Sequence, residues 1–169
     1  PEATASHGVA IADVNGDSHS DIIVANFGQP NQVFLGDGEG NLALDASSAI
    51  SQDYPVDDDG NSPHGFSDAV DAADLNGDGA ADVAFANAAS ANELFISDGN
   101  GGHALEKTSP MYNSKVDRSW AGSHSYSYGI ALANLTSDSK PDVLVVNQLI
   151  KHRLYRNVYN SSTGVFGLT

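Results

Sequence analysis

The sequence predicts an all-β chain built from three copies of one repeating unit. A loop rich in Asp and Asn occurs three times, opening at Asp13, Asp74 and Asn134, so the spacing between successive copies is almost constant. Short apolar segments flank each loop and are bounded by Gly, Asn, Asp or Pro, which is typical of strands. No segment shows a sustained apolar period of 3.6 residues, which would predict a helix. A fixed period of this kind is the sequence signature of a repeat architecture.

Each repeat is predicted to contain four strands, A to D, in chain order. Strand A is rich in Ala and Gly and is expected at 8–12, 69–73 and 129–133. Strand B is a nearly continuous apolar run, expected at 22–26, 83–87 and 143–147. Strand C follows a short turn and is expected at 31–35, 92–96 and 152–156. Glycine-rich turns at 36–40 and 98–102 then lead into strand D; hairpins are favoured there over nucleotide sites, because no helix follows.

The composition of strands A and B indicates how the sheets are arranged. Small residues in strand A are expected where sheets converge near an axis and larger side chains would clash. Apolar runs in strand B suit a sheet that is covered on both faces. Stacked four-stranded sheets satisfy both conditions, with repeats at about 5–50, 64–110 and 125–169.

Length and composition restrict the class of protein. The 169 residues leave room for one domain with its own hydrophobic core. Seven Lys and Arg against 22 Asp and Glu give a net charge of −15, which disfavours nucleic acid and anionic membranes as partners. No apolar run approaches the roughly 18 residues of a membrane-spanning helix, and the absence of Cys excludes disulfides. The chain starts at Pro1 without Met or a signal sequence, so we expect a processed form or a segment of a longer protein.

The first two loops have the oxygen pattern of a calcium site. Oxygen side chains stand at loop positions 1, 3, 5 and 9, and calcium takes six to eight oxygen ligands at roughly 2.3–2.6 Å. In repeat one we expect the ligands to be Asp13, Asn15, Asp17, Asp21 and the backbone carbonyl of His19. In repeat two we expect Asp74, Asn76, Asp78, Asp82 and the backbone carbonyl of Ala80. The alternative is an Asx turn that only caps the hairpin.

The third loop is weaker. Its candidate ligand positions are Asn134, Thr136, Asp138, Lys140 and Asp142, of which two carry a carboxylate and one is a Lys. Binding of calcium by this loop is therefore left open. We expect the ions to be structural, because a cation between close carboxylates ties strand A to strand B. Chelation should then lower the melting temperature.

The repeats resemble the FG-GAP/VCBS repeat family, whose consensus couples a DxNxDGxxD loop to an apolar strand and an Asn-containing hairpin. The match extends over essentially the whole chain. Departures are Ser18 in place of Gly in repeat one, and Asn134 and Thr136 in place of Asp and Asn in repeat three. The resemblance implies a calcium-binding β-propeller in which each repeat is one blade, as in integrin α-subunit heads and several lectins. Because three blades do not close a ring, the rest is expected from missing sequence, which we favour, or from neighbouring chains.

The long connections indicate where a ligand binds. The A–B and C–D turns of such a sheet lie at one end, and the B–C and D–A connections at the other. The two D–A connections, roughly 46–66 and 107–127, are therefore expected on the face opposite the calcium loops, where binding residues usually concentrate on a rigid scaffold. Candidate ligand-binding residues are Tyr54, Trp120, Tyr126 and Tyr128, as a stacking platform for a glycan or a hot spot for a protein.

Other features of these segments have plainer interpretations. Packing of Trp120 between blades is the alternative to a role in binding. Asp57, Asp58 and Asp59 favour a solvated acidic loop over a further cation site. Of two glycosylation sequons, Asn160 is the better acceptor, because a glycan on Asn134 and a metal at that side chain would exclude each other.

No motif predicts a catalytic residue: the sequence contains no GxSxG, HExxH or GxxxxGK[ST]. We therefore favour a non-enzymatic recognition or adhesion module, extracellular or at the cell surface, stabilised by Ca²⁺ and not inserted in a membrane. Its expected ligand is a glycan or an extracellular protein. The alternatives are the propeller portion of a calcium-dependent polysaccharide-acting enzyme and a structural subunit of a surface filament or coat.

Overall fold

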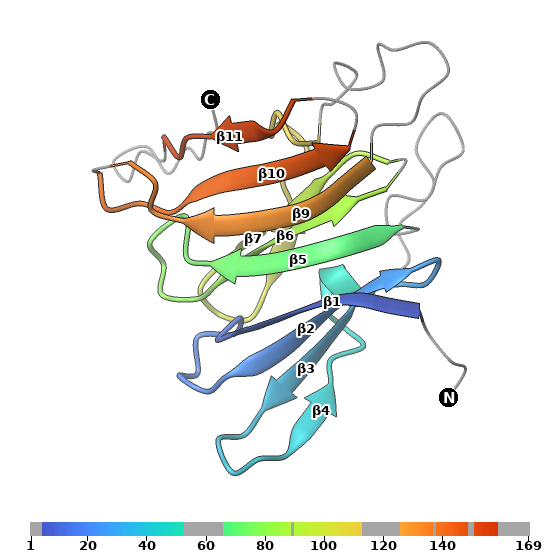
Figure 1. Cartoon of the computed structure of the whole chain (residues 1–169). Helices are drawn as coiled ribbons and strands as arrows, with labels where there is room; N and C mark the ends of the chain where they lie inside the picture. The colour runs from blue at the N-terminus through green and yellow to red at the C-terminus, as the bar shows by residue number, and fades with distance from the viewer. Residues whose placement is uncertain are drawn as a thin grey trace.

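The computed structural model describes residues 5–52, 66–88, 90–112, 126–136, 138–148 and 151–158, which form three antiparallel sheets (Figure 1). Sheet one contains β1 (Ala5–Ala12), β2 (Asp21–Phe27), β3 (Gln32–Gly36) and β4 (Leu42–Leu44). Sheet two contains β5 (Ser67–Ala73), β6 (Asp82–Asn87), β7 (Glu93–Ser97) and β8 (His103–Leu105). Sheet three contains β9 (Tyr126–Ala133), β10 (Asp142–Gln148) and β11 (Arg153–Tyr155). The prediction of an all-β chain is confirmed.

Strand order within each sheet follows chain order, as expected for strands A to D joined by hairpins. The described helical structure is one 3₁₀ turn, η1 (Ala49–Ser51), which places the fully buried Ile50 in the core. In the described ranges no helix is long and apolar enough to cross a membrane. The A–B loops and C–D turns lie at one end of the sheets, and the B–C turns at the other.

Strands β1, β5 and β9 lie side by side, with β5 between the other two. A Cβ atom added at Gly8 would lie 3.1 Å from the Cα atom of Ala69 in the next sheet, so a larger side chain would push the strands apart. This close approach explains why strand A is rich in Gly and Ala.

Two hydrophobic clusters hold the three sheets together. We call the face of a sheet that is turned to the preceding repeat its front face, and the opposite face its rear face. In sheet one, the front face is the one turned away from sheet two. The first cluster packs the rear of sheet one against the front of sheet two; its buried members include Val14, Ile23, Val33, Ile50, Val70, Val83, Phe85 and Phe95. The second packs the rear of sheet two against the front of sheet three; its buried members include Leu75, Ala84, Leu94, Met111, Val143, Val145 and Tyr155.

The expectation that strand B is covered on both faces is met by β6, in which all six residues are buried. It is wrong for β2 and β10, which alternate between buried and more exposed residues along much of their length. The physical reason is position: sheet two has a neighbour on each face, whereas sheets one and three each have one described neighbour.

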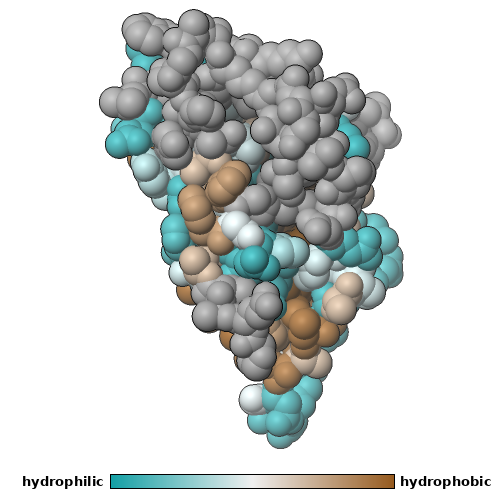
Figure 2. All heavy atoms as spheres, turned by 90° about the vertical axis from the view of Figure 1, so that its right-hand side faces the viewer, coloured by the Kyte–Doolittle hydropathy of each residue, from teal (hydrophilic) through white to brown (hydrophobic). Residues whose placement is uncertain are grey.

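Strand A carries a β-bulge at the same place in every sheet. The pairing register shifts between Ser6 and Gly8 in β1 and between Ser67 and Ala69 in β5, and β9 shows the same irregularity opposite Val146 and Asn147. The extra residues are His7, Asp68 and Tyr128, whose spacing in the sequence equals that of the three acidic loops. Because a bulge redirects a side chain from the regular ladder, these three residues occupy equivalent special positions at the end of the molecule opposite the acidic loops. Figure 2 shows this end, where hydrophobic atoms lie between hydrophilic ones on the described surface.

Candidate functional site: the acidic loops and the opposite face

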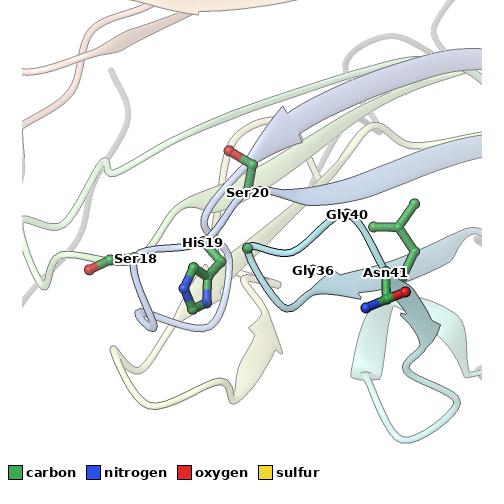
Figure 3. Close-up of a pocket in the computed structure, with 8 residues that line it drawn as sticks. Ser18, His19, Ser20, Gly36, Gly40 and Asn41 are labelled. Atoms are coloured by element: carbon green, nitrogen blue, oxygen red, sulfur yellow. The ribbon is translucent and has the colours of Figure 1, made fainter.

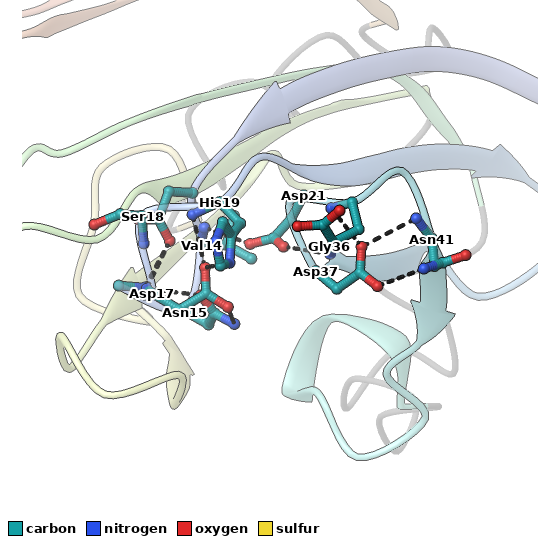
Figure 4. Close-up of polar contacts among 12 residues, drawn as sticks. Val14, Asn15, Asp17, Ser18, His19, Asp21, Gly36, Asp37 and Asn41 are labelled. Carbon is teal, nitrogen blue, oxygen red and sulfur yellow. Dashed lines mark hydrogen bonds and ion pairs between the residues drawn. The ribbon is translucent and has the colours of Figure 1, made fainter.

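The first acidic loop folds around Asp13. Figure 4 shows Asn15, Asp17 and Ser18 of this loop. The Oδ1 atom of Asp13 accepts hydrogen bonds from the N–H groups of Gly16 at 2.7 Å and Asp17 at 3.2 Å, and its Oδ2 atom accepts one from Ser18 at 2.7 Å. The side chain of Asn15 donates to Asp17 at 2.8 Å. This contact, followed by the N–H of His19, lowers the pKa of Asp17 below its ordinary value. The side chains at positions 1, 3 and 5 are thus brought together in one exposed loop.

The second loop repeats these contacts. Asp74 accepts from the N–H groups of Gly77 at 2.5 Å and Gly79 at 3.0 Å, and Asp78 accepts from the N–H of Ala80 at 2.9 Å. Asn76 accepts from the N–H of Asp78 at 2.8 Å. Both loops therefore contain the Asx-turn contacts that the sequence offered as the alternative to a metal site.

The aspartates at loop position 9 differ from those at positions 1 and 5 in their burial and in their hydrogen-bond partners. Asp21, Asp82 and Asp142 are fully buried, with 0% exposure. Their Oδ2 atoms accept the N–H groups of Val14, Leu75 and Leu135, and their Oδ1 atoms accept those of Gly36, Ser97 and Asn157. Each carboxylate thus joins the acidic loop to the end of strand C or, in sheet three, to the second residue after it. The sequence did not predict this second role.

Burial raises the pKa of Asp82 to about 7, although the N–H groups of Ser97 and Leu75 oppose the shift. A buried carboxylate that bridges two backbone segments stabilises the hairpin through these hydrogen bonds. The same contacts occupy the oxygens that would complete a ring of calcium ligands.

Loops one and two fit calcium in the chemistry of their donors, which are oxygen atoms and include one exposed and one half-buried carboxylate each. Asp13, Asn15 and Asp17, and likewise Asp74, Asn76 and Asp78, would hold the ion, with the position-9 carboxylate shared with backbone N–H groups. Over the described residues, no group of three His, Cys, Asp or Glu side chains is arranged to hold a metal. Calcium binding therefore stays a prediction.

Loop three does not fit as well. Asp138 is its one exposed carboxylate, and it accepts hydrogen bonds from Thr136 Oγ1 at 2.8 Å and from the N–H of Lys140 at 3.2 Å. These two contacts, Thr136 first, lower the pKa of Asp138. The Asp142 carboxylate is buried beneath the loop.

A cleft of about 410 Å³ lies beside loop one (Figure 3). One side is formed by Ser18, His19 and Ser20, and the other by the β3–β4 turn, at Gly36, Gly38, Gly40, Asn41 and Leu42. A Cβ atom at Gly36 would overlap the carbonyl oxygen of Ser20, and one at Gly38 would lie 2.6 Å from the His19 ring. The absence of side chains at these two positions therefore lets the turn approach the loop.

The opposite end of the molecule carries a polar and aromatic cluster, which we call the bulge site: His7, Phe27, Phe66 and Asp68. His7 Nδ1 lies 2.6 Å from Asp68 Oδ1, and the His7 ring stacks on Phe27 with a centroid distance of 5.0 Å. Phe27 meets Phe66 edge to face at 5.1 Å, and the two residues form an isolated β-bridge. Phe27 is 37% and Phe66 41% exposed, so this aromatic pair faces solvent.

Hydrogen bonds at the B–C turns hold the bulge site in place. Ser6 donates to Asn26 and Ser67 to Asn87, both at 2.8 Å, and the amides of these Asn residues donate to backbone carbonyls of their own turns. Asn31 also donates to Ser67 Oγ at 3.0 Å across the two sheets. The end of β1 that carries His7 is therefore fixed against the end of β5 that carries Asp68.

The predicted ligand-binding residues are only partly placed. Tyr128 lies on β9, 52% exposed, at the bulge position equivalent to Asp68. Tyr126 begins β9, but its side chain is not described. Tyr54, Trp120, the acidic run Asp57–Asp59 and the sequon at Asn160 lie outside the described residues. Sequence reasoning missed the bulge site, although the repeat spacing of His7, Asp68 and Tyr128 could have indicated it.

Comparison with known protein families finds the FG-GAP-like repeat twice, at residues 13–85 and 74–145. The two matches start at Asp13 and Asp74, the first residues of loops one and two. Each continues through the next acidic loop and ends in the strand that follows it. None of the curated proteins compared with the chain matches it. Because the two ranges together cover well over half of the sequence, the chain belongs to the FG-GAP-like repeat family.

Proposed function

We propose that this chain is a non-enzymatic, extracellular recognition module of the β-propeller type that binds a glycan at its bulge site. The FG-GAP-like repeats and the stacked antiparallel sheets suggest a propeller-type module. The observation that carries the proposal is the exposed aromatic pair Phe27–Phe66 beside the His7–Asp68 pair. These groups come from two repeats and meet on one face of a rigid scaffold, where binding residues usually concentrate.

The chemistry of the bulge site suits a sugar. Exposed aromatic rings offer apolar surface against which the C–H face of a pyranose packs, while their edges leave room for polar neighbours. Asp68 supplies oxygens that accept hydrogen bonds from hydroxyl groups, and His7 supplies ring nitrogens that donate or accept them. A few polar groups placed among apolar surface are what fix the orientation of a small ligand.

The test is calorimetric titration of the calcium-saturated protein with a panel of neutral and acidic oligosaccharides. We expect binding to at least one of them, and a loss of affinity of tenfold or more in Phe27→Ala and in Phe66→Ala. Asn100→Ala, on the exposed β7–β8 turn at the other end of sheet two, is the matched control and should bind as the parent does. Binding that survives both Phe substitutions would contradict the proposed site. If no saccharide binds and the protein instead adheres to an extracellular protein, the ligand class is wrong.

We also propose that loops one and two hold Ca²⁺. When bound, the ion would neutralise the exposed carboxylates of each loop and cross-link strand A to strand B. The loops lie at the end of the sheets away from the bulge site, so their role is to stabilise the fold.

A structural role as an assembling subunit is the second candidate. It is favoured by the apolar outer faces of sheets one and three, on which Ile11 and Leu154 are exposed.

A further inference from the structure

The front face of sheet one is apolar and open. Cross-strand pairing places Ile11 beside Ile22, Ile22 beside Phe34, and Phe34 beside Leu44, so these side chains share one face. Ile11 is 68% and Leu44 51% exposed. An apolar face of this kind indicates an interaction surface rather than a solvent-facing one.

This open face is equivalent, residue by residue, to a face that is buried inside the molecule. The offset that converts Asp13 to Asp74 also converts Val9 to Val70, Ile22 to Val83, Phe34 to Phe95 and Leu44 to Leu105. These four counterparts belong to the first hydrophobic cluster, or pack against it, where sheet two meets the rear of sheet one. The front of sheet one therefore has the surface that receives the rear of another repeat.

The rear face of sheet three is also apolar and exposed, and it is equivalent to a buried rear face in repeat two. Leu135 is 52% and Leu154 47% exposed. Their counterparts in repeat two are Leu75 and Leu94, which are buried in the second cluster against sheet three. The rear of sheet three thus has the kind of surface that, in sheet two, packs against the front of the next repeat.

The cleft beside loop one has a counterpart that is filled. Between repeats one and two, the carbonyl of Asp13 accepts the N–H of Ala81 at 2.8 Å. In the same contact, a Cβ atom at Gly16 would lie 3.0 Å from the carbonyl oxygen of Gly99, and one at Gly101 would lie 3.6 Å from Asn15 Cβ. Loop one of repeat one is thus seated against the turn of repeat two.

Ala81, Gly99 and Gly101 correspond to Ser20, Gly38 and Gly40, which line the cleft of repeat one (Figure 3). The cleft is therefore equivalent in position to the place where repeat two receives the acidic loop of repeat one. Asn134 corresponds to Asp13, so loop three has a carbonyl at the position that would face the N–H of Ser20.

Charge favours contact between these two ends. Residues 5–50 contain six Asp or Glu and no Lys or Arg, whereas residues 126–158 contain two Asp and four Lys or Arg. Opposite net charges attract over distances of about a Debye length and guide association. Within a net charge of −15 for each chain, the charges of these two segments are therefore complementary, which favours repeat three of one copy next to repeat one of another.

We propose that a second copy of this chain packs the rear of its repeat three on the front of repeat one, and that the reciprocal contact closes a two-fold ring of six repeats. Front-to-rear contacts form a closed ring when the rotation between units closes, and propellers of four to eight blades are the closed form of such sheets. The ring would cover both apolar faces and fill the cleft.

The test is sedimentation velocity of the chain from low micromolar to high micromolar concentration. We expect a species of twice the 17.5 kDa mass of one chain. Ile11→Asp blocks the front face and Leu154→Asp the rear face; both residues are exposed in the single chain, so the sheets should still form. Each variant alone should sediment as a monomer, because every front-to-rear contact then includes one blocked face.

An equimolar mixture of the two variants should again form a complex of twice the mass, through the one remaining pair of free faces. Asn100→Asp adds the same charge on an exposed turn away from both faces and should leave the dimer intact. A chain that stays monomeric at all concentrations, a dimer that survives both substitutions, or a mixture that does not associate would overturn the proposal. Monomeric behaviour would assign the open faces to further repeats of a longer polypeptide.

Discussion

Glu93 shows how equivalent positions in the repeats differ at the level of one residue. Its side chain is fully buried in β7 and accepts a hydrogen bond from Asn87 Nδ2 at 3.3 Å. Burial raises the pKa of Glu93 to about 8, an effect that the Asn87 contact only partly opposes. In repeat one the same position is Gln32, which accepts from Asn26 Nδ2 at 3.4 Å. The amide makes the same contact without the cost of burying a charge.

We predict that Glu93→Gln stabilises the protein at neutral pH. The unfolded chain releases the proton near the ordinary value of 4.5, whereas the folded protein keeps it until about pH 8. Between these values the native state binds the additional proton, so stability falls as pH rises through the interval. At pH 7 the variant should gain on the order of 3 kcal/mol at most, and at pH 4 it should equal the parent.

Urea unfolding of parent and variant at pH 4, 6 and 8 measures this difference. Gln32→Glu is the reverse control and should introduce a weaker dependence of the same sign, because Gln32 is only half-buried. Parallel stability profiles for the parent and Glu93→Gln would show that Glu93 is not protonated in the folded state.

Several residue-level features could not have been derived from the sequence. The loop motif predicts that Asp21 and Asp82 carry oxygens, but their hydrogen bonds to Gly36 and Ser97 depend on how strand C returns to the loop. Similarly, Phe27 and Phe66 are far apart in the chain and meet only because two sheets stack. Contacts of this kind follow from packing between elements rather than from local pattern.

At the scale of the element, the acidic loop has a strict backbone requirement at position 6. Ser18 has a φ of 69°, in the left-handed region, and the equivalent Gly79 has a φ of 95°. Side chains other than that of Gly are disfavoured in this region, because Cβ approaches the following carbonyl oxygen. The departure of Ser18 from the family pattern therefore costs stability.

We predict that Ser18→Gly raises the free energy of unfolding by about 0.5–1 kcal/mol. The free energy gained by relief of backbone strain in the folded state exceeds the free energy lost because Gly increases the conformational entropy of the unfolded chain. The reverse change in loop two, Gly79→Ser, should lower it by a similar amount. Chemical denaturation of the three proteins at one calcium concentration provides the comparison. A destabilised Ser18→Gly protein would mean that the Ser18 side chain makes a contact worth more than the strain.

Removal of calcium is predicted to destabilise the loops and the hairpins they join. At about 100-fold excess over Kd, each ion that binds only the folded state adds about 2.7 kcal/mol. This corresponds to a fall in Tm of roughly 5–11 °C per site on chelation. Scanning calorimetry with and without EDTA measures the shift.

Matched variants assign the shift to particular loops. Asp74→Ala should lose about half of the calcium-dependent shift, whereas Asp138→Ala should keep it, because loop three has Asn134 in place of the half-buried Asp at loop position 1 and so has one carboxylate outside the core instead of two. The comparison uses the difference between the two conditions, since Asp74→Ala also removes hydrogen bonds to Gly77 and Gly79. Melting that is unchanged in excess EDTA would falsify a structural role for calcium.

The elements themselves were well predicted from the sequence. Apolar segments bounded by Gly, Asn and Asp predict the positions of the strands. The expected segments 22–26, 83–87 and 143–147 lie within β2, β6 and β10. The bulges in strand A were not predicted, because an extra residue in the ladder becomes visible only when the partner strand is placed beside it.

At the scale of the whole molecule, the repeat places the acidic loops and the bulge site at opposite ends. Acidic loops and C–D turns gather at one end, while the bulge site lies at the other (Figure 1). The repeat spacing predicted this division, because alternating strands place every second connection at the same end. The spacing did not predict the bulge site, because its four side chains come from two repeats and meet only when the sheets stack. Of the three bulge residues, only Tyr128 was predicted from the sequence to bind a ligand.

We propose that the ligand binds at the end of the molecule opposite the acidic loops. The most direct measurement is amide NMR of the calcium-saturated protein during titration with the saccharide that binds it. We predict progressive shifts at His7, Phe27, Phe66 and Asp68, with the signals of residues 13–21 and 74–82 unchanged. Shifts confined to the acidic loops, with the bulge site unaffected, would contradict the assignment of the opposite face to recognition.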